Sequence, residues 1–166
     1  MTLKNRIKEL RLVKASELIP HKSNWRTHPA PQQAALQAVL EEVGIAGALI
    51  ARETAAGFEL IDGHLRADTD PDQEWPVLVL DVDESEADKL LATLDPLAAM
   101  AGADARVLDE LLKSIETDSD ELQKMLDDLA KGIGVIEPPE DFPEVDENIE
   151  ITSECPKCGF KWSGGK

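Results

Sequence analysis

The chain of 166 residues is strongly acidic, with 34 Asp and Glu against 17 Lys and Arg and a net charge of −17. Hydrophobic residues make up 42% and Tyr is absent, so we expect one ordinary domain with appendages and an aliphatic core of Leu, Val, Ile and Ala. No apolar run is long enough for a membrane span, and the charged start MTLKNRIKEL lacks the apolar stretch of a secretory signal. These features predict a cytoplasmic protein with reduced cysteines and no membrane contact.

The charge is unevenly distributed along the chain. Residues 1–66 contain nine Lys and Arg and seven Asp and Glu, whereas residues 67–166 contain eight and twenty-seven. Because DNA affinity comes largely from neutralised phosphates, any nucleic-acid or nucleotide contact is expected in the first part. The acidic part is expected to supply solubility, a partner surface or autoinhibition.

The predicted elements begin with a strand that runs into a Pro-bounded loop within residues 10–26. The stretch PQQAALQAVLEEVG, residues 31–44, has apolar residues at helical spacing and predicts a helix that ends at Gly44 in the C′ position. Residues 47–62 predict two strands joined at TAAG in a hairpin, and a short helix is expected at 64–68.

A buried strand is predicted next, in the apolar run of residues 75–82. The following segment, 83–95, predicts a helix, because Asp83 and Glu86 have the spacing of a capping box. Pro96 is expected to break this helix or to start the next turn.

Two more amphipathic helices are predicted over residues 107–115 and 122–129, the second ending near Gly132. The acidic segment 133–152 contains three prolines and is expected to be a linker without its own fold. The chain then ends in the cysteine-containing run CPKCGFKWSGGK.

This order predicts an α+β fold in four parts. A small mixed sheet with helices occupies residues 8–98, and a helical hairpin follows at 99–132. An acidic, disordered linker at 133–152 then leads to a tail with a CxxC motif at 153–166.

The motif Asp62-Gly63-His64-x-Arg66 is the main candidate site. Glycine at a strand end permits positive φ, and the first N–H groups of a following helix can bind a phosphate beside the guanidinium. His64 could be a general acid or base or a metal ligand, and Asp62 could orient it or hold a cation. The alternative is a plain strand-to-helix turn in which Asp62 caps the helix and His64 is exposed.

Four stretches carry a resemblance to a known family: Leu18-Ile19-Pro20 with Asn24 and Arg26, the helix ALQAVLEEVGI, the box LIDGHLRAD, and the run VLVLDVDESEADKLLATLD. Together they resemble the ParB/sulfiredoxin superfamily and its ParB-like nuclease domain. The resemblance covers about residues 10–98. It looks closest to ParB-like proteins of phages and mobile elements, often encoded beside DNA methyltransferases or packaging genes, and the run LATLDPLAAMA is similar to that subgroup.

The resemblance implies a mixed α+β domain that binds a nucleotide or polyphosphate, with Mg²⁺ as a companion, at its Gly-x-x-Arg box. Gly63 and Arg66 match the phosphate-contacting positions of that box. Asn24 and Arg26 match a loop that faces the same pocket. Asp95 stands where partition proteins have an Asn in their third nucleotide motif.

The box also departs from its relatives. Sulfiredoxins need a cysteine after the glycine, so His64 excludes sulfinic-acid reduction. Partition-type CTPases carry Glu-Arg-Arg there and another Arg beyond, whereas this chain has His64, Leu65, Arg66 and Asp68. CTP hydrolysis is therefore doubtful, and without a recognisable helix-turn-helix segment no centromere binding is expected. Metal-dependent cleavage of a phosphodiester through Asp62 and His64 remains open beside binding without chemistry.

Cys155 and Cys158 have the spacing of half a zinc knuckle, and Gly159 would let backbone N–H groups approach the thiolates. A structural zinc needs four ligands, which leaves three alternatives. Two chains could share one Cys₄ zinc, as a homodimer, or a partner could supply the other half. The motif could also be a remnant or a redox-active dithiol without metal.

Two functional hypotheses follow. The first is a ParB-like nucleotide- or phosphate-binding domain in DNA transactions of a phage or mobile element in its bacterial host, with weak or conditional nuclease ability. The second is a non-catalytic adaptor whose acidic helices and CxxC tail dock a DNA methyltransferase or a packaging enzyme. His21 and His28 are expected to be exposed loop residues, and Trp25 to pack or to stack on a base.

Overall fold

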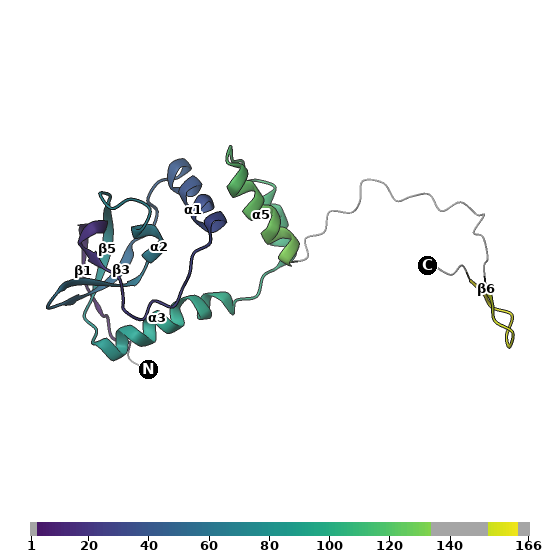
Figure 1. Ribbon diagram of the computed structural model, residues 1–166, viewed down its shortest axis with the longest axis horizontal. Coiled ribbons are helices and arrows are strands. Elements are labelled where there is room, and N and C mark those ends of the chain that lie inside the picture. The colour runs from purple at the N-terminus through teal and green to yellow at the C-terminus, as the bar shows by residue number, and fades with distance from the viewer. Residues whose placement is uncertain (1–2, 134–152, 163–166) are drawn as a thin grey trace. The chain divides into compact units, whose positions relative to one another are not determined.

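A computed structural model describes residues 3–133 and 153–162. The chain divides into two compact units, Met1–Val135 and Ile136–Lys166. The first unit combines a five-stranded sheet with five helices among its described residues (Figure 1), which confirms the expected α+β class. No helix in the described ranges is long and apolar enough to cross a membrane.

The sheet is mixed. Its strands are β1 (Ile7–Lys14), β2 (Leu18–Ile19), β3 (Leu49–Thr54), β4 (Gly57–Asp62) and β5 (Glu74–Leu80). Their order is β1-β5-β3-β4-β2, with β1 antiparallel to β5, β5 parallel to β3, β3 antiparallel to β4, and β4 parallel to β2. The predicted hairpin is thus confirmed as β3 and β4. The two-residue strand β2, which follows a 3₁₀ turn at Ala15–Glu17, was not predicted.

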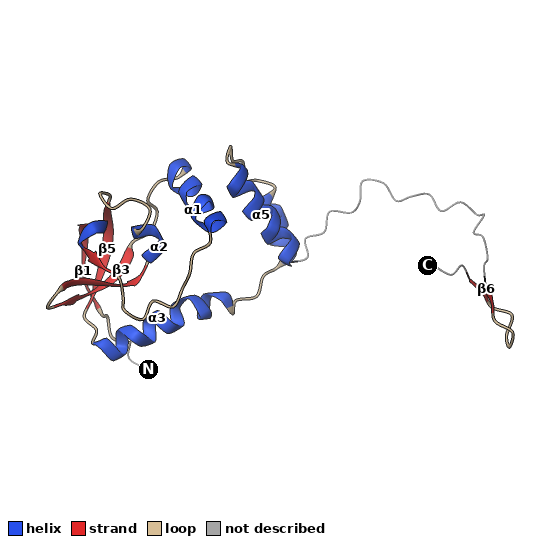
Figure 2. Cartoon of the chain, in the orientation of Figure 1, coloured by secondary structure: helices blue, strands red, loops and turns tan. Residues whose placement is uncertain are grey.

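The helices lie beside the sheet and extend beyond it (Figure 2). They are α1 (Ala30–Glu42), α2 (His64–Ala67), α3 (Glu84–Ala99), α4 (Ala105–Leu112) and α5 (Asp120–Ile133). The hairpin formed by α4 and α5 places α5 against α1, and Leu122 of α5 is buried. The two helices predicted after Pro96 are therefore present.

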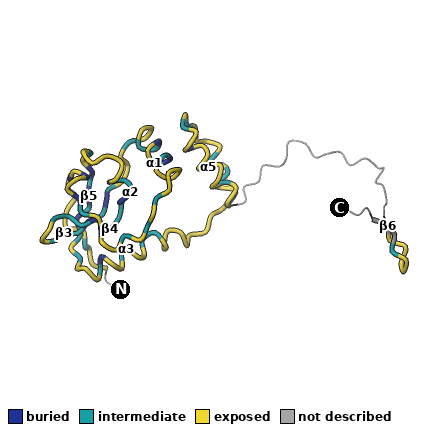
Figure 3. Tube along the Cα trace, in the orientation of Figure 1, coloured by how far each residue is buried: buried dark blue, intermediate teal, exposed yellow. Residues whose placement is uncertain are grey.

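The core lies in the strands, where the buried residues gather (Figure 3). Most of its members are aliphatic, as expected: Val13, Leu18, Leu49, Ala51, Leu60, Val77 and Val79. Trp75 is the exception, because this large ring is only 2% exposed at the start of β5. Burial of such side chains stabilises the sheet and holds the ends of β3 and β4 in register.

The start of α3 follows the predicted capping box. The Asp83 side chain accepts from the Glu86 N–H at 2.9 Å, and the Glu86 carboxylate accepts from the Asp83 N–H at 3.0 Å. Arg6 adds two contacts of 2.7 Å to the same carboxylate. The capping box fixes the beginning of α3, and Arg6 ties it to the start of β1.

The expectation for Pro96 was wrong. This proline lies inside α3, which continues to Ala99. Proline removes one helical hydrogen bond, but its φ is compatible with helix, and the Met100 N–H still bonds the Pro96 carbonyl at 3.1 Å. Asp95 is consequently a helical residue near the last turn of α3.

Candidate phosphate-binding pocket

The turn after β4 has the conformation that its sequence predicts. Gly63 has φ +95° and ψ 20°, in the left-handed region, and directly precedes the single helical turn α2. A Cβ at this position would lie 2.4 Å from Cδ2 of Leu49, so glycine is required by space as well as by φ. No side chain caps α2, so the capping role considered for Asp62 is not found.

The Arg66 side chain reaches back to residues that flank the Gly63 turn. Its Nη1 donates to the Ala48 carbonyl at 3.2 Å, and its Nη2 donates to Asp62 Oδ2 at 3.2 Å. Both partners lie where β3 begins and β4 ends, since Asp62 is paired with Ile50 across the hairpin. The sheet therefore holds the guanidinium beside Gly63, with its remaining N–H groups available for other acceptors.

His64 is buried, at 8% exposure, and this corrects the alternative in which it is exposed. Its Nε2 accepts from the His21 backbone N–H at 3.2 Å, which places the ring proton on Nδ1 when the ring is neutral. Burial is the main cause that lowers the pKa of His64, against the opposing charges of Asp68 and Asp62. The ring is therefore held neutral near physiological pH.

His21 was expected to be exposed and is buried instead, at 3% exposure. Its Nδ1 accepts from the Ser23 N–H at 3.1 Å. Its Nε2 is fully enclosed, makes no hydrogen bond, and lies 3.5 Å from Asp88 Oδ1 and 3.9 Å from Glu59 Oε2. His21 thus serves as an anchor that fixes the loop between β2 and α1.

That loop brings a second arginine to the pocket. Arg26 Nε lies 2.5 Å from Asp95 Oδ2 on α3, a close ion pair in which the N–H direction does not meet hydrogen-bond geometry. The guanidinium carbon also lies 4.7 Å from the centre of the Trp25 ring. The Asn24 side chain accepts from the Arg26 N–H at 3.3 Å and helps to set the loop conformation.

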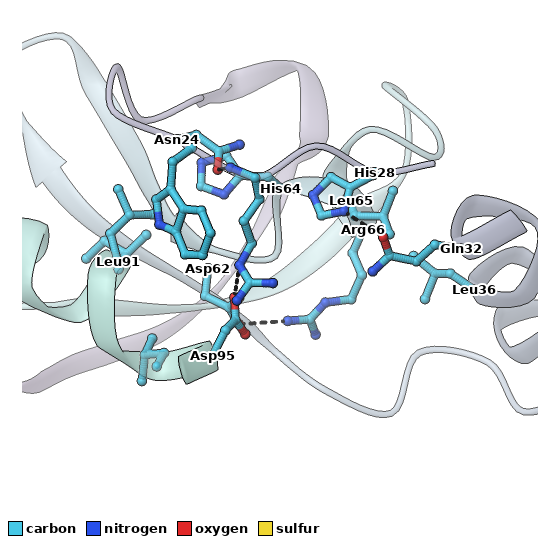
Figure 4. A pocket seen from close by; sticks show the side chains of 14 residues that line it. Asn24, His28, Gln32, Leu36, Asp62, His64, Leu65, Arg66, Leu91 and Asp95 are labelled. Carbon is cyan, nitrogen blue, oxygen red and sulfur yellow. Dashed lines mark hydrogen bonds and ion pairs between the residues drawn. The ribbon is translucent and has the colours of Figure 1, made fainter. Parts of the chain in front are cut away.

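These elements enclose one pocket of about 240 Å³ (Figure 4). Its lining includes six of the predicted site residues, which come from three separate parts of the chain: Asn24, Arg26, Asp62, His64, Arg66 and Asp95. Gly63 forms the turn beside them. Further lining residues that the prediction did not assign to the site are Trp25, His28, Gln32, Leu36, Ile61, Leu65, Leu91 and Leu94.

The charges of this pocket are balanced within it. Two guanidinium groups face two carboxylates, and each arginine is paired, Arg66 with Asp62 and Arg26 with Asp95. These side chains remain between about one quarter and one half exposed, so the pairs are accessible to solvent and to ligands. An anion entering the pocket would compete with the carboxylates for the guanidinium groups.

Few side chains in the part of the chain that the structure describes are placed to ligate a metal ion. Within residues 3–133 and 153–162, no group of three or more His, Cys, Asp or Glu side chains is arranged to hold a metal ion. Asp62 is engaged with Arg66, and His64 uses Nε2 for the loop. Cys155 and Cys158 lie together in the second unit, where both are free thiols.

No protein-family model matches the chain, and no curated protein matches it. It is similar, with a TM-score of 0.48 and 19% identity, to the C-terminally truncated chromosome-partitioning protein ParB from Caulobacter crescentus complexed with CTP-γ-S, over 63% of this chain and 60% of that one. It is also similar to a Pnob8-like ParB-N domain, with a TM-score of 0.44 and 16% identity over 78% of this chain and 64% of the other. The chain thus spans less than two thirds of either protein.

Proposed function

We propose that this pocket binds a phosphate group of a nucleotide or of a nucleic acid, and that the chain acts as a ParB-like binding domain in DNA transactions. One observation carries the proposal: Arg26 and Arg66, from two distant segments, reach the same small pocket beside the turn at Gly63. Converging guanidinium groups suit the geometry of phosphate oxygens. The association with a phage or mobile element rests on the sequence resemblance alone.

The size of the pocket limits the ligand. Its volume of about 240 Å³ is below the roughly 300–1,000 Å³ of sites that enclose drug-sized molecules. This volume supports a phosphate with part of an attached sugar better than an enclosed nucleoside triphosphate. Trp25, which is 57% exposed at the rim, offers a flat surface for a base outside the pocket.

The proposal is for binding without chemistry. Cleavage of a phosphodiester through Mg²⁺ would use Asp62 and His64, but Asp62 already pairs with Arg66 and His64 Nε2 already accepts from His21. Nuclease activity therefore stays a prediction of the family resemblance. Bound Mg²⁺ would enter with the nucleotide's own phosphate oxygens as ligands.

Chemical-shift changes in ¹H–¹⁵N spectra of the full chain test this proposal. The probes are inorganic phosphate, a nucleoside monophosphate, CTP and a short single-stranded DNA, each with and without Mg²⁺. We expect saturable shifts at Asn24, Gly63 and the Arg66 side chain. Arg66→Ala should abolish them, and Arg106→Ala, which removes an exposed arginine on α4, should not.

Two results would overturn phosphate binding by this pocket. One is a lack of saturable shifts in the wild type at millimolar concentrations of all four probes. The other is unchanged binding in Arg66→Ala, since the guanidinium would then play no part. Cleavage of the DNA probe in the same samples would report the nuclease activity separately.

The adaptor remains a second candidate because one surface favours it. Several large apolar side chains on α4 and α5 and between them are exposed: Val107, Leu111, Ile115, Met125 and Leu129. Leu111→Asp should weaken co-purification with a co-encoded methyltransferase or packaging enzyme, while Arg66→Ala should not. Equal recovery of the partner by both variants would exclude this surface.

A further inference from the structure

The cysteine tail in the second unit is a closed hairpin. Strands β6 (Ser153–Glu154) and β7 (Lys161–Trp162) pair in antiparallel fashion. Between them, the Cys155 N–H bonds the Phe160 carbonyl at 2.8 Å, and the Gly159 N–H bonds the Cys155 carbonyl at 2.9 Å. Gly159 has φ +73°, which lets the chain turn back after Cys158.

The turn holds the CxxC pair in one tight loop. Cys155 and Cys158 are three residues apart, and the bond from the Gly159 N–H to the Cys155 carbonyl closes the chain around them. Both are free thiols, Cys155 partly buried and Cys158 exposed. This spacing on a tight turn suits two of the four thiolates of a structural zinc site.

We propose that Cys155 and Cys158 are half of a tetrahedral zinc site whose other half comes from a second copy of this chain. One Zn²⁺ would then join two knuckles through four thiolates. The inference is independent of phosphate binding, because it uses only residues of the second unit.

The ligand count requires a second source of thiolates. Structural zinc takes four ligands, the knuckle supplies two, and the described residues contain no cluster of three or more metal-binding side chains. A second copy presents the same two sulfurs in the same geometry, so a two-fold axis through the metal completes the site.

The local charge permits this pairing in an otherwise acidic protein. Residues 155–166 contain three lysines and no Asp or Glu, in a chain of net charge −17. A zinc ion with four thiolates carries two negative charges, which Lys157 between the two cysteines would partly offset. Phe160, at 68% exposure beside the knuckle, adds apolar surface for contact between the copies.

Metal analysis and native mass spectrometry of the full chain, purified under reducing conditions with zinc present, test the proposal. We expect a dimer that holds one zinc ion per two chains and that dissociates to monomers when a chelator removes the metal. Cys155→Ser and Cys158→Ser should each lose both zinc and dimer. Titration of the metal-free protein with Co²⁺ should end at one ion per two chains, with the strong charge-transfer absorption of four thiolates.

Three outcomes would overturn it. They are a monomer with one zinc per chain, a metal-free protein in excess zinc, and a dimer that survives chelation. Arg66→Ala serves as the matched control, because it should abolish phosphate binding and leave the zinc-bound dimer intact. Failure of the zinc site and failure of the phosphate site are thereby distinguished.

Discussion

The backbone N–H of His21 donates to Nε2 of His64 at 3.2 Å, and both rings are buried. This bond connects the loop that carries Asn24 and Arg26 to the helical turn that carries Arg66. The loop is held at its base by two further bonds, from the Ser23 N–H to His21 Nδ1 and from the Asn24 N–H to the His21 carbonyl. This histidine pair therefore helps to set the relative position of the two guanidinium groups of the pocket.

Two substitutions of His64 should show how much its hydrogen bond from the His21 N–H stabilises the fold. In His64→Leu the buried His21 N–H loses its acceptor, which we expect to lower the free energy of unfolding by about 1–3 kcal/mol. His64→Gln should recover part of this loss, because its amide oxygen can reach the position of Nε2. Urea unfolding measures both, and equal stability of the two variants would show that the bond contributes nothing.

Stability should also depend on the protonation of His64. Burial keeps the folded-state pKa below the ordinary value of 6.5, so the unfolded chain binds a proton that the folded chain does not. The free energy of unfolding is therefore highest above pH 6.5, and it falls as the pH drops from 6.5 toward the folded-state pKa of His64. The slope for one proton is at most about 1.4 kcal/mol per pH unit.

Urea unfolding between about pH 7.5 and 5.5 checks this dependence. His64→Gln should flatten the decline below pH 6.5. His28→Gln provides the control, since His28 lines the pocket but bonds only Gln32 among the contacts of its ring. A decline of the same size in the wild type and in His64→Gln would assign it to other groups.

Removing a carboxylate from the pocket should strengthen anion binding. In Asp95→Asn, Arg26 loses its charged partner, so phosphate no longer competes for that guanidinium. We expect affinity for inorganic phosphate to rise about two- to fivefold, in line with a partly exposed ion pair. Asp109→Asn on α4, which breaks a pair with Lys113 just past the end of that helix, should leave the affinity unchanged. Weaker phosphate binding in Asp95→Asn would show that Asp95 acts through another route, such as a metal.

The turn at Gly63 should not tolerate a side chain. In Gly63→Ala the new Cβ meets Leu49 at 2.4 Å and the residue keeps an unfavourable φ, which we expect to cost about 2–4 kcal/mol. Gly102→Ala is the matched control, because no atom lies within 4 Å of a Cβ built there. Thermal unfolding compares the two, and a Gly63→Ala protein as stable as Gly102→Ala would disprove the constraint.

Most of the secondary structure could be predicted because it rests on local patterns. Helix α1 has apolar residues at helical spacing, the β3–β4 hairpin has strands around a Gly-containing turn, and α3 opens with a capping box. Strand β2 escaped prediction because two residues carry no periodicity, and it exists only through its pairing with β4. Pro96 misled because proline is normally a helix breaker, whereas α3 continues through it and loses only the bond that a residue 96 N–H would have made.

The grouping of Asn24, Arg26 and Asp95 with the Gly63 turn followed from the family resemblance, but the charge pairs of the pocket did not. Which carboxylate meets which arginine depends on how α3 and the β2–α1 loop are placed in space, and no local pattern specifies the Arg26–Asp95 contact. The burial of His21 was missed for a similar reason. Its neighbours in sequence are polar and suggest an exposed loop, whereas enclosure comes from Asp88, Glu59 and His64 on distant elements.

Pro96 weakens the end of α3 next to Asp95, which lines the pocket. Because proline has no N–H, the carbonyl of Ala92 lacks its usual helical donor, and the last turn of α3 is held by one bond fewer than the turns before it. We expect this end of α3 to bend at lower cost than its capped beginning. When a ligand draws Arg26 away from Asp95, we therefore expect the last turn of α3 to shift at low cost while the sheet keeps its structure.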